Sequence, residues 1–131
     1  MELSKPNSNE DCIFCNLDEK RIILTSDNFI VISDAYPVSV GHLLIVSKNH
    51  IENFFLLNEQ ERFELTDIIN KSREIIEEKY KPDGFNIGIN CGKVAGQTIM
   101  HFHCHLIPRY VGDVPNPRGG VRQIIPGKGN Y

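Results

Sequence analysis

Short runs of β-branched and aliphatic residues, separated by turn residues, lie on both sides of one long amphipathic segment. Residues 21–25 and 29–33 form two such runs around a short polar turn, and this pattern predicts a β-hairpin. The apolar run at residues 42–46 predicts a buried central strand. The runs at residues 85–90 and 101–108 predict two further strands.

The long segment has the spacing of an amphipathic helix. Apolar residues recur every three or four positions between residues 65 and 80, with charged residues between them. Asn58 can cap the N-terminus, and Glu61 stands at the position that completes a capping box. The sequence Lys-Pro-Asp-Gly at residues 81–84 ends the helix. Residues 50–57 predict a second, short helix.

Strands before and after one long helix, joined by short loops, predict an α+β fold with a mainly antiparallel sheet. A length of 131 residues fits a single domain, residues 1–131. Residues 1–11 are polar and are expected to form a flexible N-terminus. Residues 111–131 contain three prolines and five glycines, which predicts an extended C-terminal arm.

Composition excludes several classes of protein. Hydrophobic residues make up 40% and charged residues 24%, as in an ordinary globular domain. The formal net charge of -3 gives no reason to expect nucleic acid as a partner, and no apolar run is long enough for a membrane helix. Residues 1–10 lack the apolar core of a secretory signal, so we expect a cytoplasmic protein whose four cysteines are reduced.

Three of the five histidines alternate with apolar residues in the last predicted strand. His101, His103 and His105 would share one face of a strand, about 6.6 to 6.8 Å apart at their backbones. Phe102 and Cys104 would then face the core. A half-exposed strand that carries histidines by chance, without a functional role, is one interpretation. Clustered imidazoles repel one another when charged, however, and so indicate a function.

Three functions fit this row of histidines. It could hold a catalytic metal ion with an open coordination position. It could supply a nucleophilic imidazole together with a second imidazole that binds phosphate oxygens. It could also lend one histidine to a structural zinc site.

The row His101-x-His103-x-His105, preceded by Gly96-Gln97-Thr98, resembles the histidine-triad family of nucleotide hydrolases and transferases. The resemblance extends over most of the chain. It includes the following further residues, in the expected order: Cys12, Cys15, Asp34, Gly41, His42, Lys48, Asn49, His50, Asn90 and residues 117–122.

The resemblance assigns roles residue by residue. It implies that His103 is the nucleophile, which attacks the α-phosphorus of a nucleotide, and that His105 donates to the phosphate oxygens. Thr98 matches a residue that contacts the leaving group or the phosphate. The remaining nucleotide-binding residues implied by the family are a ribose-binding Asp34, a supporting His42, and a phosphate cradle of Asn90, Gly96 and Gln97.

The pair Cys12-x-x-Cys15 has three interpretations: a zinc knuckle, a reduced pair without metal, or a redox pair. The resemblance favours structural zinc, with His50 and His101 as the other two ligands. Family members often have proline where Ser47 precedes the turn that carries His50. No organic cofactor is implied.

These observations favour an enzyme that cleaves a bond at the α-phosphate of a purine nucleotide derivative. Nucleoside phosphoramidates, nucleotidyl conjugates and dinucleoside polyphosphates are the substrate classes that the resemblance implies. A nucleotide-sensing binding protein with little catalysis is the alternative. The family also implies a homodimer with an AMP-like ligand.

Overall fold

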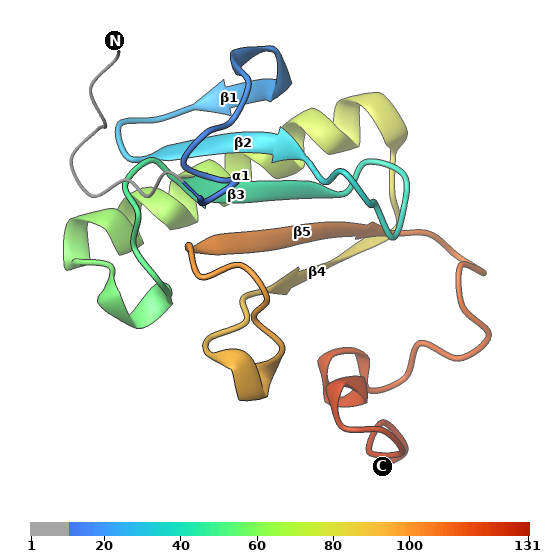
Figure 1. Ribbon diagram of the computed structural model, residues 1–131. Helices are drawn as coiled ribbons and strands as arrows, with labels where there is room; N and C mark the ends of the chain where they lie inside the picture. The colour runs from blue at the N-terminus through green and yellow to red at the C-terminus, as the bar shows by residue number, and fades with distance from the viewer. Residues whose placement is uncertain (1–10) are drawn as a thin grey trace, which may run out of the picture.

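The computed structural model describes residues 11–131 and contains a five-stranded antiparallel sheet with one long helix on one face (Figure 1). The strands are β1 (Ile22–Thr25), β2 (Phe29–Ser33), β3 (Leu43–Ser47), β4 (Gly84–Gly88) and β5 (His103–Arg109). Their order across the sheet is β1-β2-β3-β5-β4. The predicted α+β class is therefore confirmed, whereas the predicted flexibility of residues 1–10 concerns a segment outside the described residues.

The long helix α1 (Glu59–Tyr80) begins with the predicted capping box. The Asn58 side chain accepts a hydrogen bond from the Glu61 amide, and the Glu61 carboxylate accepts one from the Asn58 amide, both at 2.8 Å. The helix ends at Lys81, which adopts a left-handed conformation. Both ends thus arise from local side-chain and backbone chemistry.

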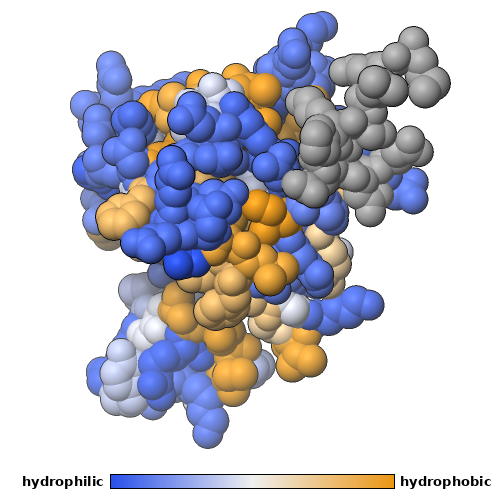
Figure 2. All heavy atoms as spheres, turned by 90° about the vertical axis from the view of Figure 1, so that its left-hand side faces the viewer, coloured by the Kyte–Doolittle hydropathy of each residue, from blue (hydrophilic) through white to orange (hydrophobic). Residues whose placement is uncertain are grey.

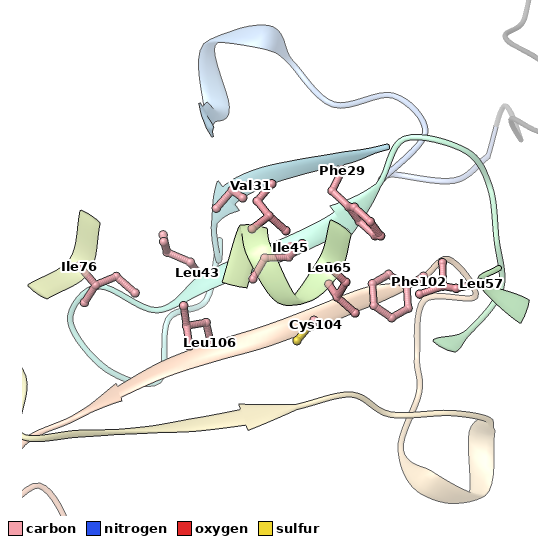
Figure 3. Packing of buried hydrophobic residues seen from close by; sticks show 11 residues of the cluster. Phe29, Val31, Leu43, Ile45, Leu57, Leu65, Ile76, Phe102, Cys104 and Leu106 are labelled. Carbon is pink, nitrogen blue, oxygen red and sulfur yellow. The ribbon is translucent and has the colours of Figure 1, made fainter. Parts of the chain in front are cut away.

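The core lies between α1 and the sheet (Figure 3). The buried face of β5 contributes Cys104 and Leu106, and Phe102 joins them from the residue before the strand. Burial raises the pKa of the Cys104 thiol to about 12, so this cysteine is a neutral core residue. Phe29 from β2 packs edge-on against Phe102, with ring centroids 6.0 Å apart.

The helix is also tied to the turn of the β1–β2 hairpin. The carboxylate of Glu64 accepts hydrogen bonds from the Ser26 hydroxyl, the Asn28 amide and the Asn28 side chain. These bonds lower the pKa of Glu64 despite its partial burial. The predicted hairpin is confirmed, with β2 as the middle of a three-stranded meander.

Strand β5 begins two residues later than the sequence predicts. The Phe102 amide donates to the Ile51 carbonyl, and the Phe102 carbonyl accepts from the Ser47 amide, so this stretch pairs with a loop and with the end of β3. Strand β4 ends at Gly88 instead of residue 90. The predicted short helix at residues 50–57 is one 3-10 turn, Phe54–Leu56.

Glycine is required where β3 begins. Gly41 has a φ of 92°, and a Cβ atom there would lie 2.8 Å from the Tyr80 ring. The close contact between this turn and the end of α1 therefore depends on the missing side chain. The turn sets the position of the next residue, His42, at the entrance to β3.

The C-terminal segment contains one 3-10 helix, Gly120–Ile124, which lies against β4. The guanidinium groups of Arg118 and Arg122 lie 5.4 and 4.3 Å from the centre of the Tyr131 ring. These cation–π contacts bring the last residue of the chain close to the 3-10 helix and to the residues just before it.

Large hydrophobic side chains are exposed on the side of the molecule where α1 begins. Figure 2 looks onto this side and shows hydrophobic atoms gathered across its middle. Phe55, Leu56 and Phe63 are more than half exposed and come from the 3-10 turn and the start of α1. Within residues 11–131, no helix is both long enough and apolar enough to cross a membrane.

Candidate active site and metal-binding cluster

The five histidines of the chain lie close together. Four of them belong to two neighbouring groups, and the fifth, His103, contacts His105 on the sheet face opposite α1. Strand β5 sends Cys104 and Leu106 into the core, so His103 and His105 face the other way. Their ring centroids are 5.3 Å apart. The remaining histidine of the row, His101, precedes the strand and belongs to the group that contains the two cysteines.

The first group brings together Cys12, Cys15, His50 and His101, whose ligand atoms all lie within 4.8 Å of one another. The His101 Nδ1 atom lies 3.3 Å from Cys12 Sγ, 3.4 Å from Cys15 Sγ and 3.1 Å from His50 Nδ1. Ligand atoms in a tetrahedral zinc site are about 3.3 to 3.8 Å apart. This Cys12–His101 cluster could therefore hold a metal ion with four protein ligands.

The protonation of His101 suits metal binding. Its Nε2–H donates to the Ser47 carbonyl at 2.7 Å, with the Ser47 hydroxyl oxygen 3.1 Å away. Nδ1 is then the unprotonated atom, and it faces the cysteines. Burial lowers the pKa of His101, which further favours the neutral ring.

Ser47 supports the cluster, although the family pattern often has proline there. Its side chain is buried, and its hydroxyl donates to the Asn49 carbonyl at 2.7 Å. This bond closes the turn that carries His50 toward Cys15, where His50 Nδ1 and Cys15 Sγ are 3.2 Å apart. A hydroxyl and a backbone carbonyl thus restrain the turn in place of a proline ring.

The second group comprises Asp34, His42 and His105. The Nε2 atom of His42 lies 3.0 Å from His105 Nδ1 and 3.4 Å from the Asp34 carboxylate. The Val38 amide donates to His42 Nδ1 at 3.2 Å, which places the His42 proton on Nε2. His42 can then donate to His105 Nδ1, so that His105 carries its own proton on Nε2.

This arrangement argues against a metal ion among Asp34, His42 and His105. A metal bound at His42 Nε2 would require the proton to move to Nδ1, where the Val38 amide already donates. The three groups are better described as a hydrogen-bonded relay that ends at His105. Nor do the three histidines of the row converge on one ion, because each directs its Nδ1 to a different partner.

His103 is held in the opposite tautomer. Its Nδ1–H donates to the His101 carbonyl at 2.9 Å, which leaves the lone pair on Nε2. The side chain is almost fully buried. The row therefore offers one bare ring nitrogen on His103 and one N–H on the adjacent ring of His105.

Burial, followed by the neighbouring rings of His103 and His42, lowers the pKa of His105 to about 4, while the Asp34 carboxylate opposes the shift. Burial likewise lowers the pKa of His42, again against the opposing effect of Asp34. Both rings are therefore neutral near pH 7. A neutral His105 can still donate a hydrogen bond through Nε2–H.

The lowered pKa of His105 makes stability depend on pH. Below its ordinary pKa of 6.5 the unfolded chain binds a proton that the folded protein does not bind until the pH approaches about 4. We expect the free energy of unfolding to decrease over this interval as the pH falls, by up to about 3 kcal/mol from His105 alone. An NMR titration of the imidazole signals measures the pKa directly, and His105→Asn should flatten the pH dependence of denaturant unfolding. A His105 midpoint near 6.5 would contradict this expectation.

The loop between β4 and β5 carries the other predicted binding residues. The Gln97 side chain is buried and serves the loop itself: it accepts from the Gly92 amide and donates to the Glu52 and Ile99 carbonyls. Thr98 is exposed beside the cluster, where it lines a hollow with Cys12 and His50. In the described residues, neither Asn90 nor Thr98 hydrogen-bonds to an imidazole. Asn90 is half-buried, and Gly96 is exposed with a φ of 97°.

Phe14 is a site residue that the sequence analysis did not single out. It lies between the two cysteines, is buried, and contacts the rings of His101 and His103. Its position inside the Cys-x-x-Cys motif was the available signal. Val38 acts only through its backbone amide, so its side chain gave no indication of its contact with His42.

A five-stranded antiparallel sheet with one long helix and a row of alternating histidines on its open face defines a histidine-triad protein. The comparisons with known proteins agree. The family model described as "HIT domain" matches residues 17–112, so the chain belongs to the HIT, or histidine-triad, family.

Individual relatives and solved structures show the same family. An uncharacterized HIT-like protein of Saccharolobus solfataricus is 35% identical over 106 residues, which cover 78% of this chain and 76% of that protein. An AP-4-A phosphorylase of Mycobacterium tuberculosis is 31% identical, over 73% of this chain and 50% of that enzyme. The crystal structure of a zinc-bound histidine-triad family protein from Mycobacterium smegmatis is 30% identical, with a TM-score of 0.71 over 79% of this chain and 78% of that one.

Proposed function

We propose that this protein cleaves a bond at the α-phosphate of purine nucleotide derivatives through a nucleotidyl intermediate on His103. The observation that carries the proposal is the pair of opposite tautomers in the row. The His101 carbonyl fixes the proton of His103 on Nδ1, and His42 fixes that of His105 on Nε2. A nucleophilic nitrogen thus lies next to a hydrogen-bond donor, as phosphoryl transfer through an imidazole requires.

In the first step, His103 Nε2 donates its lone pair to the α-phosphorus and forms an N–P bond. The bond from phosphorus to the leaving group breaks, and the leaving group takes the electron pair and a proton from solvent. His105 Nε2–H donates to a phosphate oxygen as negative charge builds there. The Asp34 carboxylate, 3.8 Å from His105 Nδ1, stabilises any positive charge that His105 acquires.

In the second step, water attacks the same phosphorus and loses a proton to solvent, the N–P bond breaks with its electron pair on His103 Nε2, and AMP is released when the nucleoside is adenosine. His103 recovers its lone pair on Nε2. We assign ribose binding to Asp34, and phosphate binding to Asn90 together with the backbone of Gly96 and Gln97. Thr98 is assigned to the leaving group or the phosphate. The Gln97 side chain is engaged within the loop, and the Gly96 and Gln97 amides donate to the Lys93 and Gly92 carbonyls. The cradle assignment therefore rests on the resemblance and requires these amides to turn toward the phosphate.

The substrate classes that we propose are nucleoside phosphoramidates, nucleotidyl conjugates and dinucleoside polyphosphates. The Mycobacterium tuberculosis relative, an AP-4-A phosphorylase, supports the last class. All three share a nucleoside joined to an α-phosphate, and they differ in the leaving group.

We propose that Cys12, Cys15, His50 and His101 hold a structural zinc ion. The zinc-bound Mycobacterium smegmatis structure and the unprotonated Nδ1 of His101 support this assignment. When bound, zinc would join the segment at Cys12 to the turn at His50 and to the start of β5, and it would leave His103 and His105 free to react.

We further propose a homodimer in the cytoplasm. Strand β4 is an edge strand of the described sheet, so its outer backbone groups can pair with a second copy. Reduced thiols, which the metal site needs, are typical of the cytoplasm.

The proposal is tested by incubating the protein with adenosine 5′-phosphoramidate and measuring released AMP by chromatography. We expect each protein molecule to release many molecules of AMP. The ratio of kcat/KM for diadenosine polyphosphates to that for the phosphoramidate then shows which leaving group is preferred. Tight binding of AMP without turnover of either class would contradict the proposal and favour a nucleotide-sensing binding protein.

A further inference from the structure

The Cys12–Cys15 segment contacts the candidate nucleophile through Phe14, the residue directly before Cys15. The Phe14 ring centroid lies 5.0 Å from that of His103, with the ring planes tilted by 58°. It also lies 5.9 Å from the His101 ring, nearly perpendicular to it. With only 6% of Phe14 exposed, the ring is held firmly in this position.

Two supports therefore reach His103 from the same metal-binding cluster. The His101 side chain belongs to the cluster, and the His101 backbone carbonyl accepts the Nδ1–H of His103 at 2.9 Å. Phe14 adds the second support from between the two cysteines. The turn is closed by the Cys15 amide, which donates to the Cys12 carbonyl at 3.2 Å.

A single hydrogen bond at Nδ1 fixes one atom of an imidazole but leaves the ring free to tilt about that bond. When the ring tilts, the Nε2 atom of His103 moves off the line along which it attacks phosphorus. Displacements of this kind are costly, since an error of about 1 Å can reduce a rate by about 100-fold. Phe14 and His105 both contact the His103 ring, and together they restrict its tilt.

We propose that Phe14 is a positioning residue, which orients the His103 ring so that Nε2 is aimed at the α-phosphorus. This inference rests on the proposed role of His103 as nucleophile. The Cys-x-x-Cys segment then has two functions: it holds the metal ion, and it places an aromatic ring against the nucleophile. Phe14 itself does not touch the reacting atoms.

Phe14 also packs with Ile32, Leu44 and Val46, so a purely structural role is the competing explanation. A matched control separates the two. Ile32 is fully buried in the same small cluster but lies on β2, with Leu44 of β3 between it and His105, and no ring contact joins it to His103. Phe14→Leu and Ile32→Val each keep an apolar side chain, and both cause a modest loss of packing.

The kinetic test compares these two variants on adenosine 5′-phosphoramidate. We expect Phe14→Leu to lower kcat by about 10- to 100-fold with KM unchanged within about twofold. Ile32→Val should keep kcat close to that of the wild type. An unchanged kcat in Phe14→Leu, or an equal loss in both variants, would overturn the proposal. A raised KM with unchanged kcat would also overturn it, because Phe14 would then belong to the nucleotide-binding surface.

An NMR measurement keeps the inference distinguishable from the proposed function. Nuclear Overhauser signals between the ring protons of His103 and His105 report the tilt of the His103 ring, independently of the ring current of Phe14. We expect these His103 signals to change in Phe14→Leu and to keep their intensity in Ile32→Val. Should the wild-type protein release no AMP, the proposed function fails, while the NMR comparison still decides whether Phe14 orients His103. Unchanged His103 signals in Phe14→Leu would then overturn the inference.

Discussion

Replacement of His103 by alanine abolishes AMP release from adenosine 5′-phosphoramidate, by a factor on the order of 10³ or more, while the protein stays folded. The physical reason is that no other ring in the site offers a bare nitrogen in the same place. His105 carries its proton on Nε2, and His101 directs its bare nitrogen to the cysteines. Removal of His103 therefore leaves binding groups without a nucleophile.

A second substitution separates nucleophilic attack from packing. In His103→Asn, the side-chain amide can still donate to the His101 carbonyl, the partner of His103 Nδ1, but it offers no nucleophilic ring nitrogen. We expect the same loss of turnover and a smaller loss of stability than in His103→Ala. His105→Asn, which removes only the phosphate donor, should lower kcat by a factor of about 10² to 10³. Activity within tenfold of the wild type in both His103 variants would refute the assignment.

If the Cys12–His101 cluster holds the proposed zinc ion, loss of the ion destabilises the fold, because the four candidate ligands come from three distant parts of the chain. We expect Cys12→Ser to lower the free energy of unfolding by about 3 to 5 kcal/mol, since the binding energy of a structural metal is folding energy. A chelator such as EDTA should cause a similar loss in the wild type and no further loss in Cys12→Ser. Thermal unfolding and metal analysis of the purified protein measure both effects.

Cys91→Ser is the matched control, because Cys91 is also half-buried but lies outside the metal-binding cluster. It should change stability little. Chelation that stops turnover without changing the unfolding curve would instead indicate a catalytic metal ion among the histidines. A wild-type protein that carries no metal, and whose stability is insensitive to chelators, would contradict the structural-zinc assignment.

Features that depend on local chemistry could be predicted from the sequence. The capping box of α1 needs only Asn58 and Glu61 at the right spacing, and the first hairpin needs only two β-branched runs around a turn. The alternation of Phe102, Cys104 and Leu106 with the histidines also assigns the two faces correctly. These patterns repeat with the period of the element itself, so no distant contact is needed.

Features that depend on tertiary contacts could not be predicted in this way. The start of β5 is set by the hydrogen bonds that Phe102 donates to Ile51 and accepts from Ser47, both about fifty residues earlier in the chain. The tautomers of His42 and His103 are set by backbone groups of Val38 and His101. Backbone donors and acceptors carry no residue-type signal, and only the folded chain reveals which ring they meet.

The separation of the histidine row into two sites is the clearest example. On an isolated strand, His101, His103 and His105 look equivalent, and a shared metal ion is as reasonable as a nucleophile. The structure removes His101 from the row, because its ring turns to Cys12 and Cys15 while its carbonyl holds His103. One residue thus links the metal-binding cluster to the candidate nucleophile.

The central claim, a covalent nucleotidyl intermediate on His103, is tested most directly by intact-protein mass spectrometry. Wild-type protein and His103→Ala are mixed with adenosine 5′-phosphoramidate and quenched rapidly. Acid is avoided in the quench because acid would break an N–P bond. The account predicts a mass increase of one AMP unit in the wild type alone, and digestion of that sample places the adduct on the peptide that contains His103. An adduct of the same size in His103→Ala would contradict the account. Turnover at the wild-type rate by a variant that lacks His103 would also contradict it.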